Sequence, residues 1–233
     1  MTSPIIVAID GPSGAGKSTV ARRLAERLGV PYIDTGAMYR AVGLAAREAG
    51  IQLPVEDAEK VVSIAESLVI ELVPGNDGAA RVLSNGRDVS DAIRTPEVSA
   101  YASAVSAIPG VRRRMVAQQR HLAERRGGVM EGRDIGTRVF PKTPFKFFLT
   151  APSEVRAQRR FRELQERGTP QGYEKVLTEM RQRDRADETR QDSPLTLDDS
   201  YVLVETTGKT ADQVVDELEK RVRPVFDSGR PPQ

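Results

Sequence analysis

The sequence predicts an α/β fold in which helices cover both faces of a parallel sheet. Three observations support this prediction. The β-branched run Ile5–Ile9 leads through a glycine-rich loop into an amphipathic helix. Short apolar runs and helical patterns then alternate along most of the 233 residues. Finally, the pair Asn85–Gly86 lies between alternating apolar residues, which indicates an antiparallel hairpin inserted into the series.

The first part of the chain alternates strands and helices up to a region of different character. Apolar residues recur at helical spacing over 20–28, and Gly29 ends this helix. A strand is expected over 31–33, followed by a helix rich in small residues that ends near Gly50. Residues 55–94 then contain a helical pattern, the run LVIELV, a glycine-rich turn and the hairpin. Because this hairpin interrupts parallel elements, we expect the region to be an inserted subdomain.

The remaining chain returns to alternating elements. Thr95-Pro96-Glu97 combines a capping hydroxyl, a proline in the first turn and an early acid, which is typical of a helix start. We expect helices over 96–108, 109–126, 153–167 (capped by Ser153), 173–189 and 211–226, strands over 129–131, 145–149 and 201–205, and a disordered tail over 227–233.

The composition is that of a globular protein, with 39% hydrophobic and 29% charged residues. Cysteine is absent, which excludes disulfides and suits a reducing compartment. The start MTSPIIVAID has no basic region and too few apolar residues for a signal or membrane segment, so we expect a cytoplasmic protein.

A net charge of +2 and 5% aromatic residues argue against a stable nucleic-acid partner. His121, the single histidine, is expected on a helix surface, so no zinc site is predicted.

The stretch GPSGAGKS at 11–18 matches the phosphate-binding pattern G-x-x-x-x-G-K-[ST] at every fixed position. Glycines let backbone amides turn toward a phosphate, and the following helix N-terminus adds partial positive charge. Lys17 is expected to reach the β- and γ-phosphates, and the Ser18 hydroxyl to bind Mg²⁺. We therefore assign the nucleoside triphosphate, which the resemblance described below implies is ATP, to Gly11, Pro12, Ser13, Gly14, Ala15, Gly16, Lys17, Ser18 and Thr19, with Ser18 as the metal ligand.

Other sequence features indicate which class of nucleotide-binding protein this is. A guanine-reading Asn-Lys-x-Asp element is not found. The strand expected at 129–131 is short and ends in Glu131, unlike the longer apolar strand ending in Asp that is usual in motor and transport ATPases. A small-molecule kinase instead needs a second anion site. Arg40 and Arg133 follow predicted strands, and in a parallel sheet such positions lie at the edge that also carries the phosphate loop.

Two predicted helices near the C-terminal end are rich in arginine. Arg183, Asp187 and Arg190 share one helix face, and Arg156, Arg159 and Arg160 follow helical spacing on the preceding helix. One interpretation is a solvated face with Arg–Asp pairing. The other is a mobile lid, with hinges at Gly168 and Gly172, that brings positive charge over the phosphates. Transfer to a phosphate acceptor needs charge neutralisation and exclusion of water rather than a strong base.

Several motifs together resemble those of the bacterial cytidylate kinases, a family of nucleoside monophosphate kinases. IDGPSGAGKST, DTGAMYR, IRTPEV, ASAVSAIPGVR, GRDIGTRVFP and the spaced RD, D and R of the second arginine-rich helix occur in family order over nearly the whole chain. The resemblance implies a three-layer P-loop fold with a five-stranded parallel sheet, a lid and a monophosphate-binding insert. It places the core at 1–54, 95–155 and 191–226, the insert at about 55–94 and the lid at about 156–190.

The same resemblance implies an activity. The expected reaction is ATP + (d)CMP → ADP + (d)CDP with Mg²⁺, in pyrimidine nucleotide metabolism, by a monomeric enzyme. The implied catalytic residues are Lys17, Arg133 and Arg183, and Arg156 and Arg160 of the lid are assigned to ATP. Contacts to the acceptor phosphate fall on Thr35, Arg40, Arg133 and Arg183, those to the base on Ser103, Arg112 and Asp134, and those to the sugar on Asp187 and Arg190, with Tyr39 lining the site.

The base assignment agrees with the chemistry of cytosine. Its amino group is a donor that Asp134 can accept, and Arg112 can donate to N3 and O2. Uracil would reverse both interactions, so we expect CMP to be preferred over UMP, and over purine nucleotides more strongly.

Two departures from the family pattern and several alternatives remain. Glu131 stands where the family more usually has Asp, and residues 186–189 differ within the lid.

Among kinases, the alternatives are enzymes acting on UMP, AMP or shikimate. Outside that class, the alternatives are a regulatory nucleotide switch or an RNA-binding P-loop protein; Arg112–Arg114 and Arg125–Arg126 are basic clusters that bear on the latter.

Overall fold

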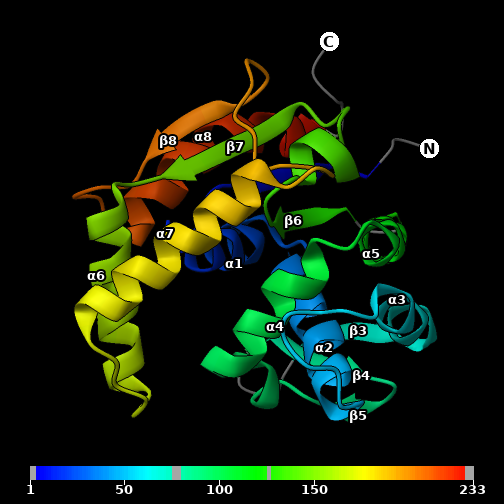
Figure 1. Ribbon diagram of the computed structural model, residues 1–233. Helices are drawn as coiled ribbons and strands as arrows, with labels where there is room; N and C mark the ends of the chain where they lie inside the picture. The colour runs from blue at the N-terminus through cyan, green and yellow to red at the C-terminus, as the bar shows by residue number, and fades with distance from the viewer. Residues whose placement is uncertain (1–3, 75–79, 125–126, 229–233) are drawn as a thin grey trace. The chain divides into compact units, whose positions relative to one another are not determined.

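A five-stranded parallel sheet with the order β2-β6-β1-β7-β8 carries the phosphate-binding loop in the computed structural model, which confirms the predicted α/β class (Figure 1). Its strands are β1 (Ile6–Asp10), β2 (Tyr32–Asp34), β6 (Gly128–Glu131), β7 (Phe145–Thr150) and β8 (Val202–Glu205). The central strand β1 pairs in parallel with β6 and β7, so that Ile9 lies opposite both Glu131 and Phe147. The carboxyl ends of these strands therefore lie at one edge of the sheet.

The structure describes residues 4–74, 80–124 and 127–228. The chain divides into two units, Met1–Tyr32 with Arg126–Gln233 (the first unit) and Ile33–Arg125 (the second unit). The division into core, insert and lid remains a prediction. The glycine-rich turn at 75–79, the end of the helix predicted over 109–126 and the tail 229–233 lie outside the described residues.

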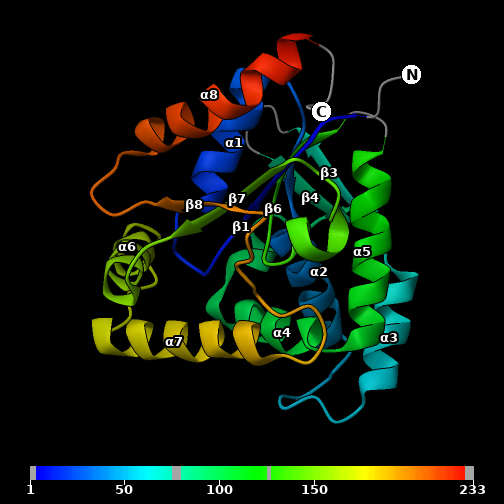
Figure 2. The same ribbon diagram turned by 90° about the horizontal axis from the view of Figure 1, so that it is seen from above.

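In the first unit, two helices pack on one face of the sheet. These are α1 (Lys17–Leu28) and α8 (Ala211–Ser228), which lie side by side in Figure 2. Their apolar residues, among them Leu24 and Leu218, form one buried cluster with Val7 and Ile9 of β1. Burying each such side chain contributes about 1.5–3 kcal/mol, so the strand and helix flanking the phosphate-binding loop are firmly held.

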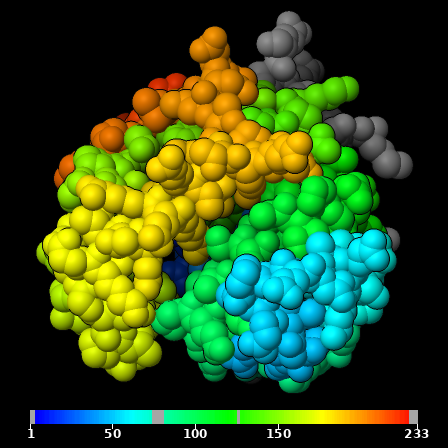
Figure 3. Space-filling view, in the orientation of Figure 1, coloured from blue at the N-terminus to red at the C-terminus, as the bar shows by residue number. Residues whose placement is uncertain are grey.

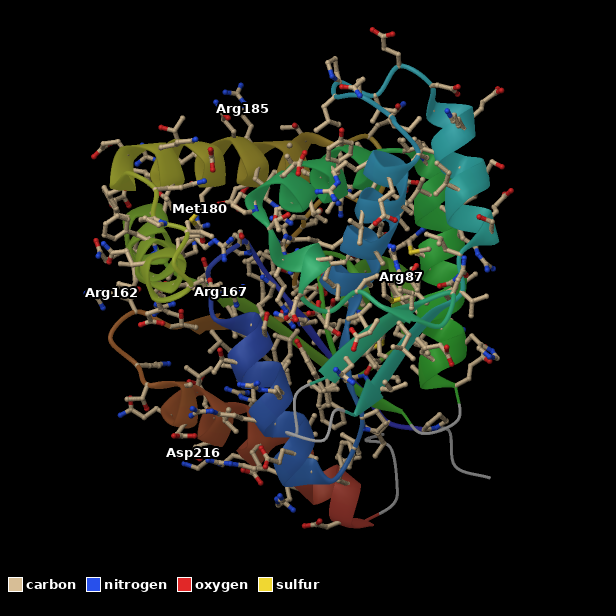
Figure 4. The ribbon with its side chains drawn as sticks, turned by 90° about the horizontal axis from the view of Figure 1, so that it is seen from below. Arg87, Arg162, Arg167, Met180, Arg185 and Asp216 are labelled. Atoms are coloured by element: carbon tan, nitrogen blue, oxygen red, sulfur yellow. The ribbon has the colours of Figure 1, made fainter. Side chains whose placement is uncertain are left out.

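A helical hairpin follows β7 in the same unit. Its helices are α6 (Ser153–Glu166) and α7 (Tyr173–Thr189), both exposed on the face shown in Figure 3, and they share a small core that includes Met180. Figure 4 shows Met180 on the side of α7 that faces α6 and Arg185 pointing away. The predicted Ser153 cap is wrong. Ser153 is the first helical residue after Pro152, and its hydroxyl accepts from Arg181 Nε at 3.3 Å.

The second unit combines helices with a three-stranded antiparallel sheet in the order β3-β4-β5. Its elements are α2 (Thr35–Glu48), α3 (Ala58–Ser67), β3 (Ile70–Pro74), β4 (Ala80–Ser84), β5 (Arg87–Asp88), the short 3-10 helix η1 (Ala92–Arg94), α4 (Pro96–Ser106) and α5 (Pro109–Ala123). The predicted hairpin is confirmed, with φ of 48° at Asn85 and 77° at Gly86 between β4 and β5. The Thr95 cap is confirmed as well, since its hydroxyl accepts from the Val98 amide at 3.2 Å.

The helices of the second unit enclose a separate core. α2 and α4 approach closely at Gly43, where an added Cβ would lie 2.8 Å from the Ala102 amide nitrogen. Met38, Leu44 and Met115 are fully buried in this core. Within the described ranges, no helix is long and apolar enough to span a membrane.

Candidate functional site

The loop between β1 and α1 has the backbone that its glycines require. Gly11, Gly14 and Gly16 have φ of 142°, 75° and 90°. At Gly11 an added Cβ would lie 2.1 Å from the Leu149 carbonyl oxygen, so no side chain fits there. Gly16 precedes the first residue of α1, which places the loop directly before a helix N-terminus. This is the local structure that suits binding of a polyphosphate.

Lys17 is the buried cation of this loop. The residue is 6% exposed, and Nζ donates to the Pro12 carbonyl at 2.7 Å. Burial, together with the positive charges of Arg133 and Arg183, lowers the pKa of Lys17 to about 7, against the opposing effect of Glu131. A bound polyphosphate would favour the charged form, so this lysine is poised to respond to an anion.

Ser18 and Glu131 place oxygen ligands beside the loop. The Ser18 hydroxyl donates to Oε2 of Glu131 at 2.9 Å, and Tyr32 donates to the other carboxylate oxygen. In the described part of the chain, no three His, Cys, Asp or Glu side chains are placed to hold a metal ion by themselves. Mg²⁺ takes few protein ligands and keeps water and phosphate oxygens, so a hydroxyl beside a carboxylate fits this ion.

A cluster of alternating charges lies at the end of β6 and on α7. Arg133 Nε donates to Oδ2 of Asp187 at 2.8 Å, and Arg190 lies 3.6 Å from Asp187 and 3.8 Å from Asp134. Burial alone would raise the pKa of Asp187, but Arg133, Arg183 and Arg190 outweigh it and hold the pKa below its ordinary value. Asp187 and Arg190 are paired but buried, so they do not form a solvated face.

The lid arginines differ from one another in their contacts. Arg156 is buried, donates from Nε to the Ala151 carbonyl at 2.8 Å and from Nη1 to the Ser13 carbonyl at 2.9 Å, and pairs with Asp184. Asp184 in turn accepts from the Ser13 amide at 3.2 Å. Both polar groups of Ser13's backbone are thus held by α6 and α7. Arg160 pairs instead with Glu163 at 2.8 Å. The assignment of Arg156 and Arg160 to ATP stays a prediction.

The predicted residues of the second unit lie on its helices. Thr35, Tyr39 and Arg40 are on α2, where Thr35 is buried. Arg112 of α5 is 2% exposed and lies 5.6 Å from the centroid of the Tyr39 ring, a cation–π distance. Its Nη1 also donates to the Ser106 carbonyl at 3.2 Å, near Ser103 in sequence on α4. The structure therefore brings Tyr39 and Arg112 together.

Some predictions about surface residues can also be compared with the structure. His121 lies on the surface as predicted, with its side chain 80% exposed and 3.7 Å from Glu124. Arg112 is buried, so the run 112–114 is not a continuous exposed basic patch. Arg125–Arg126 lie outside the described residues.

Sequence reasoning missed Asp10, Tyr32, Asp184 and Tyr201, which hold the functional loops by hydrogen bonds. One signal pointed to Asp10, since it is an acid at the end of an otherwise apolar strand. Asp184 belongs to the RD pair of the family pattern but was interpreted as part of a solvated face, whereas it is buried. Tyr32 and Tyr201 carried no local signal, because their partners are distant in sequence.

Comparisons with known proteins identify the family of the chain. The family model described as cytidylate kinase matches residues 7–224. The cytidylate kinase of Caldanaerobacter subterraneus subsp. tengcongensis is 49% identical over 93% of this chain and 94% of its own length, and that of Geobacter sulfurreducens is 47% identical over 94% and 93%. A solved structure of an uncharacterized protein from Eubacterium ventriosum is similar in fold, with a TM-score of 0.51 at 15% identity over 94% of this chain and 98% of that one. The chain therefore belongs to the cytidylate kinase family of enzymes.

Proposed function

We propose that the enzyme transfers the γ-phosphoryl group of ATP to CMP and dCMP, giving CDP and dCDP. The observation that carries this proposal is the charge cluster of Arg133, Asp134, Asp187 and Arg190, which belongs to the same unit as the phosphate-binding loop. A nucleotide switch binds its triphosphate with such a loop but has no second anion to bind. A kinase with an anionic acceptor also needs buried arginines, which this cluster supplies.

The donor half of the reaction belongs to residues 11–19. In the proposal, the loop amides and Lys17 bind the triphosphate, and Ser18 holds Mg²⁺ with Glu131 behind it. The ion, when bound, neutralises charge on the β- and γ-phosphates. Arg156 positions the loop at Ser13 and, with Arg160, is assigned to the ATP side of the lid.

The transfer itself needs little proton chemistry. An oxygen of the CMP phosphate forms a bond to the γ-phosphorus, the bond from that phosphorus to the bridging oxygen breaks, and ADP leaves with the electron pair. The acceptor oxygen is already anionic, so no strong base is required. Lys17, Arg133 and Arg183 are proposed to stabilise the charge that develops on the transferring group.

Recognition of the acceptor is assigned to the residues that match the family motifs. The proposed contacts are Thr35, Arg40, Arg133 and Arg183 for the phosphate, Ser103, Arg112 and Asp134 for cytosine, and Asp187 and Arg190 for the sugar, with Tyr39 beside Arg112. Arg190 and Asp134 lie close together, so the sugar and base contacts are coupled through one ion pair. The enzyme is further proposed to act as a monomer in the cytoplasm.

The test is an ADP-release assay across CMP, dCMP, UMP, AMP and shikimate, with Lys17→Ala as the inactive control. We expect kcat/KM to be highest for CMP and dCMP and lower by at least about 10-fold for UMP. Asp134→Ala should reduce this preference. Equal kcat/KM for CMP and UMP would overturn the base assignment, and tight RNA binding without turnover of any monophosphate would favour the RNA-binding alternative.

A further inference from the structure

A fully buried carboxylate lies where β1 ends and the phosphate-binding loop begins. Asp10 is the last residue of β1 and is 0% exposed, directly after the apolar residues Ala8 and Ile9. Burying a carboxylate in such surroundings is costly unless hydrogen bonds replace the water it loses. Burial does raise the pKa of Asp10, and the hydrogen bonds that it accepts oppose this effect. The donors of those hydrogen bonds therefore show which segments of the chain Asp10 holds in place.

Three donors from two distant segments converge on Asp10. The amide of Ile135 donates to Oδ1 at 3.0 Å, and the amide of Gly136 donates to Oδ2 at 2.9 Å. The hydroxyl of Tyr201 donates to the same Oδ2 at 2.7 Å. Ile135 and Gly136 begin η2, a single π-helical turn over Ile135–Val139, and they follow Arg133 and Asp134 without an intervening residue.

Tyr201 is itself fixed in place. Its side chain is buried, and its ring packs edge-on against Phe148 with a centroid distance of 6.0 Å. It also forms a side-chain hydrogen bond with Thr137 of the same turn. At Gly136 an added Cβ would lie 2.6 Å from the Tyr201 hydroxyl, so this hydroxyl occupies the space that a side chain would need.

We propose that Asp10 and Tyr201 are positioning residues that fix the loop bearing Arg133 and Asp134, and so maintain selection for cytosine. This inference rests on the proposed function, which assigns Asp134 to the base. The two amides after Asp134 donate to Asp10 of β1, and the Ile135 amide shares its peptide plane with the Asp134 carbonyl, so these bonds restrain the backbone of Asp134. Discrimination between base edges requires donors and acceptors held within about 0.5 Å. Asp10 and Tyr201 act through the loop and touch no substrate.

The main test is Tyr201→Phe, which removes the hydroxyl and keeps the ring contact with Phe148. The matched control is Tyr101→Phe, which removes a hydroxyl of similar burial that donates to the Ile51 carbonyl at 2.8 Å. Tyr101 lies two residues from Ser103, which places the two on nearly opposite sides of α4, about 200° apart. For Tyr201→Phe we expect KM for CMP to rise about 10-fold and the CMP-to-UMP ratio of kcat/KM to fall, with KM for ATP within about twofold of wild type. The control should keep the wild-type ratio.

An unchanged CMP-to-UMP ratio in Tyr201→Phe would overturn the inference, even if the variant were less stable, because a purely structural role predicts lower stability alone. A second measurement does not depend on any substrate. In Asp10→Asn the side chain keeps one acceptor oxygen for three donors, so the amides of Ile135 and Gly136 should exchange with solvent at least about 10-fold faster by NMR. Unchanged exchange would overturn the positioning role. Failure of the wild-type enzyme to phosphorylate CMP would instead overturn the proposed function, and the exchange measurement would still decide whether Asp10 holds the loop.

Discussion

Arg133 donates from Nε to Oδ2 of Asp187 at 2.8 Å, so an arginine assigned to the acceptor phosphate is already paired with a carboxylate from α7. Arg183 and Arg190 act on the same carboxylate. A phosphate that binds to these arginines would offset the positive charge that Asp187 now offsets. Asp187 therefore offsets part of the positive charge of these arginines, and the residues of the cluster can be tested one at a time.

Asp187→Asn should destabilise the protein in a pH-dependent way. Because the pKa of Asp187 is held below its ordinary value of 3.8, its ion pairs contribute stability that is fully present above about pH 4 and is lost as the pH falls through the lowered pKa. We expect the free energy of unfolding at pH 7 to fall by about 3 kcal/mol, measured by urea denaturation. The exposed neighbour Glu188→Gln serves as control. This account would be contradicted if the difference in the free energy of unfolding between wild type and Asp187→Asn did not shrink below pH 4.

Lys17→Met should separate stability from activity. We expect kcat to fall by at least about 100-fold, because the charge on Lys17 matters most as the phosphoryl group transfers. The free energy of unfolding at pH 7 should rise by about 1–2 kcal/mol, because the variant no longer buries an ammonium group. The pKa of Lys17 is lowered to about 7, so this gain should shrink as the pH rises from 7 toward 10, where the folded wild type holds the lysine neutral. Lys175→Met on the exposed face of α7 is the control. An equal increase in its free energy of unfolding would show that burial of the Lys17 ammonium group is not the cause.

The pair Arg156 and Asp184 should control ATP binding through Ser13. Asp184→Asn weakens the hold on the Ser13 amide, and Arg156→Lys removes the planar group that reaches both Ser13 and Ala151. We expect either change to raise KM for ATP about 10-fold while KM for CMP stays within about twofold. Arg181→Lys, which alters an exposed pair with Glu154, should leave both values unchanged. Equal increases in the two KM values would show that the pair does not act on the loop in particular.

Glu131→Asp should weaken the response to Mg²⁺. Glu131 binds Ser18 and Tyr32 with its two oxygens, and a side chain shorter by one methylene cannot reach both. We expect the Mg²⁺ concentration for half-maximal rate to rise about 10-fold. Tyr32→Phe keeps the Ser18 bond and should shift the curve less. Superimposable magnesium curves for wild type and Glu131→Asp would rule out this role.

Much of the fold could be predicted because its signals are local. The loop at 11–18, the Thr95 cap and the Asn85–Gly86 turn each depend on residues within a few positions of one another, and all three were found correctly. The Ser153 cap failed for a reason that is also local. Pro152 occupies the cap position, so Ser153 begins the helix instead.

The residue types of the candidate site could be predicted from the sequence. The hydrogen bonds and ion pairs that hold those residues in place could not. Arg156 was assigned to ATP from its spacing, and spacing does not show that its guanidinium turns toward Ser13 and Asp184. Ser13 and Asp184 are 171 positions apart, so no pattern in a single sequence links them. Periodicity identifies which face of a helix is charged. Only the folded chain shows what that charge touches.

The hydroxyl of Tyr201 lies where a side chain at residue 136 would be, and this has a consequence for how the sequence can change over time. A mutation that gives residue 136 a side chain would be tolerated only after Tyr201 had been replaced by a smaller residue. Replacing Tyr201 first would leave a buried gap and an acid lacking one of its donors. Homologues with a side chain at residue 136 are therefore expected to lack a tyrosine at residue 201.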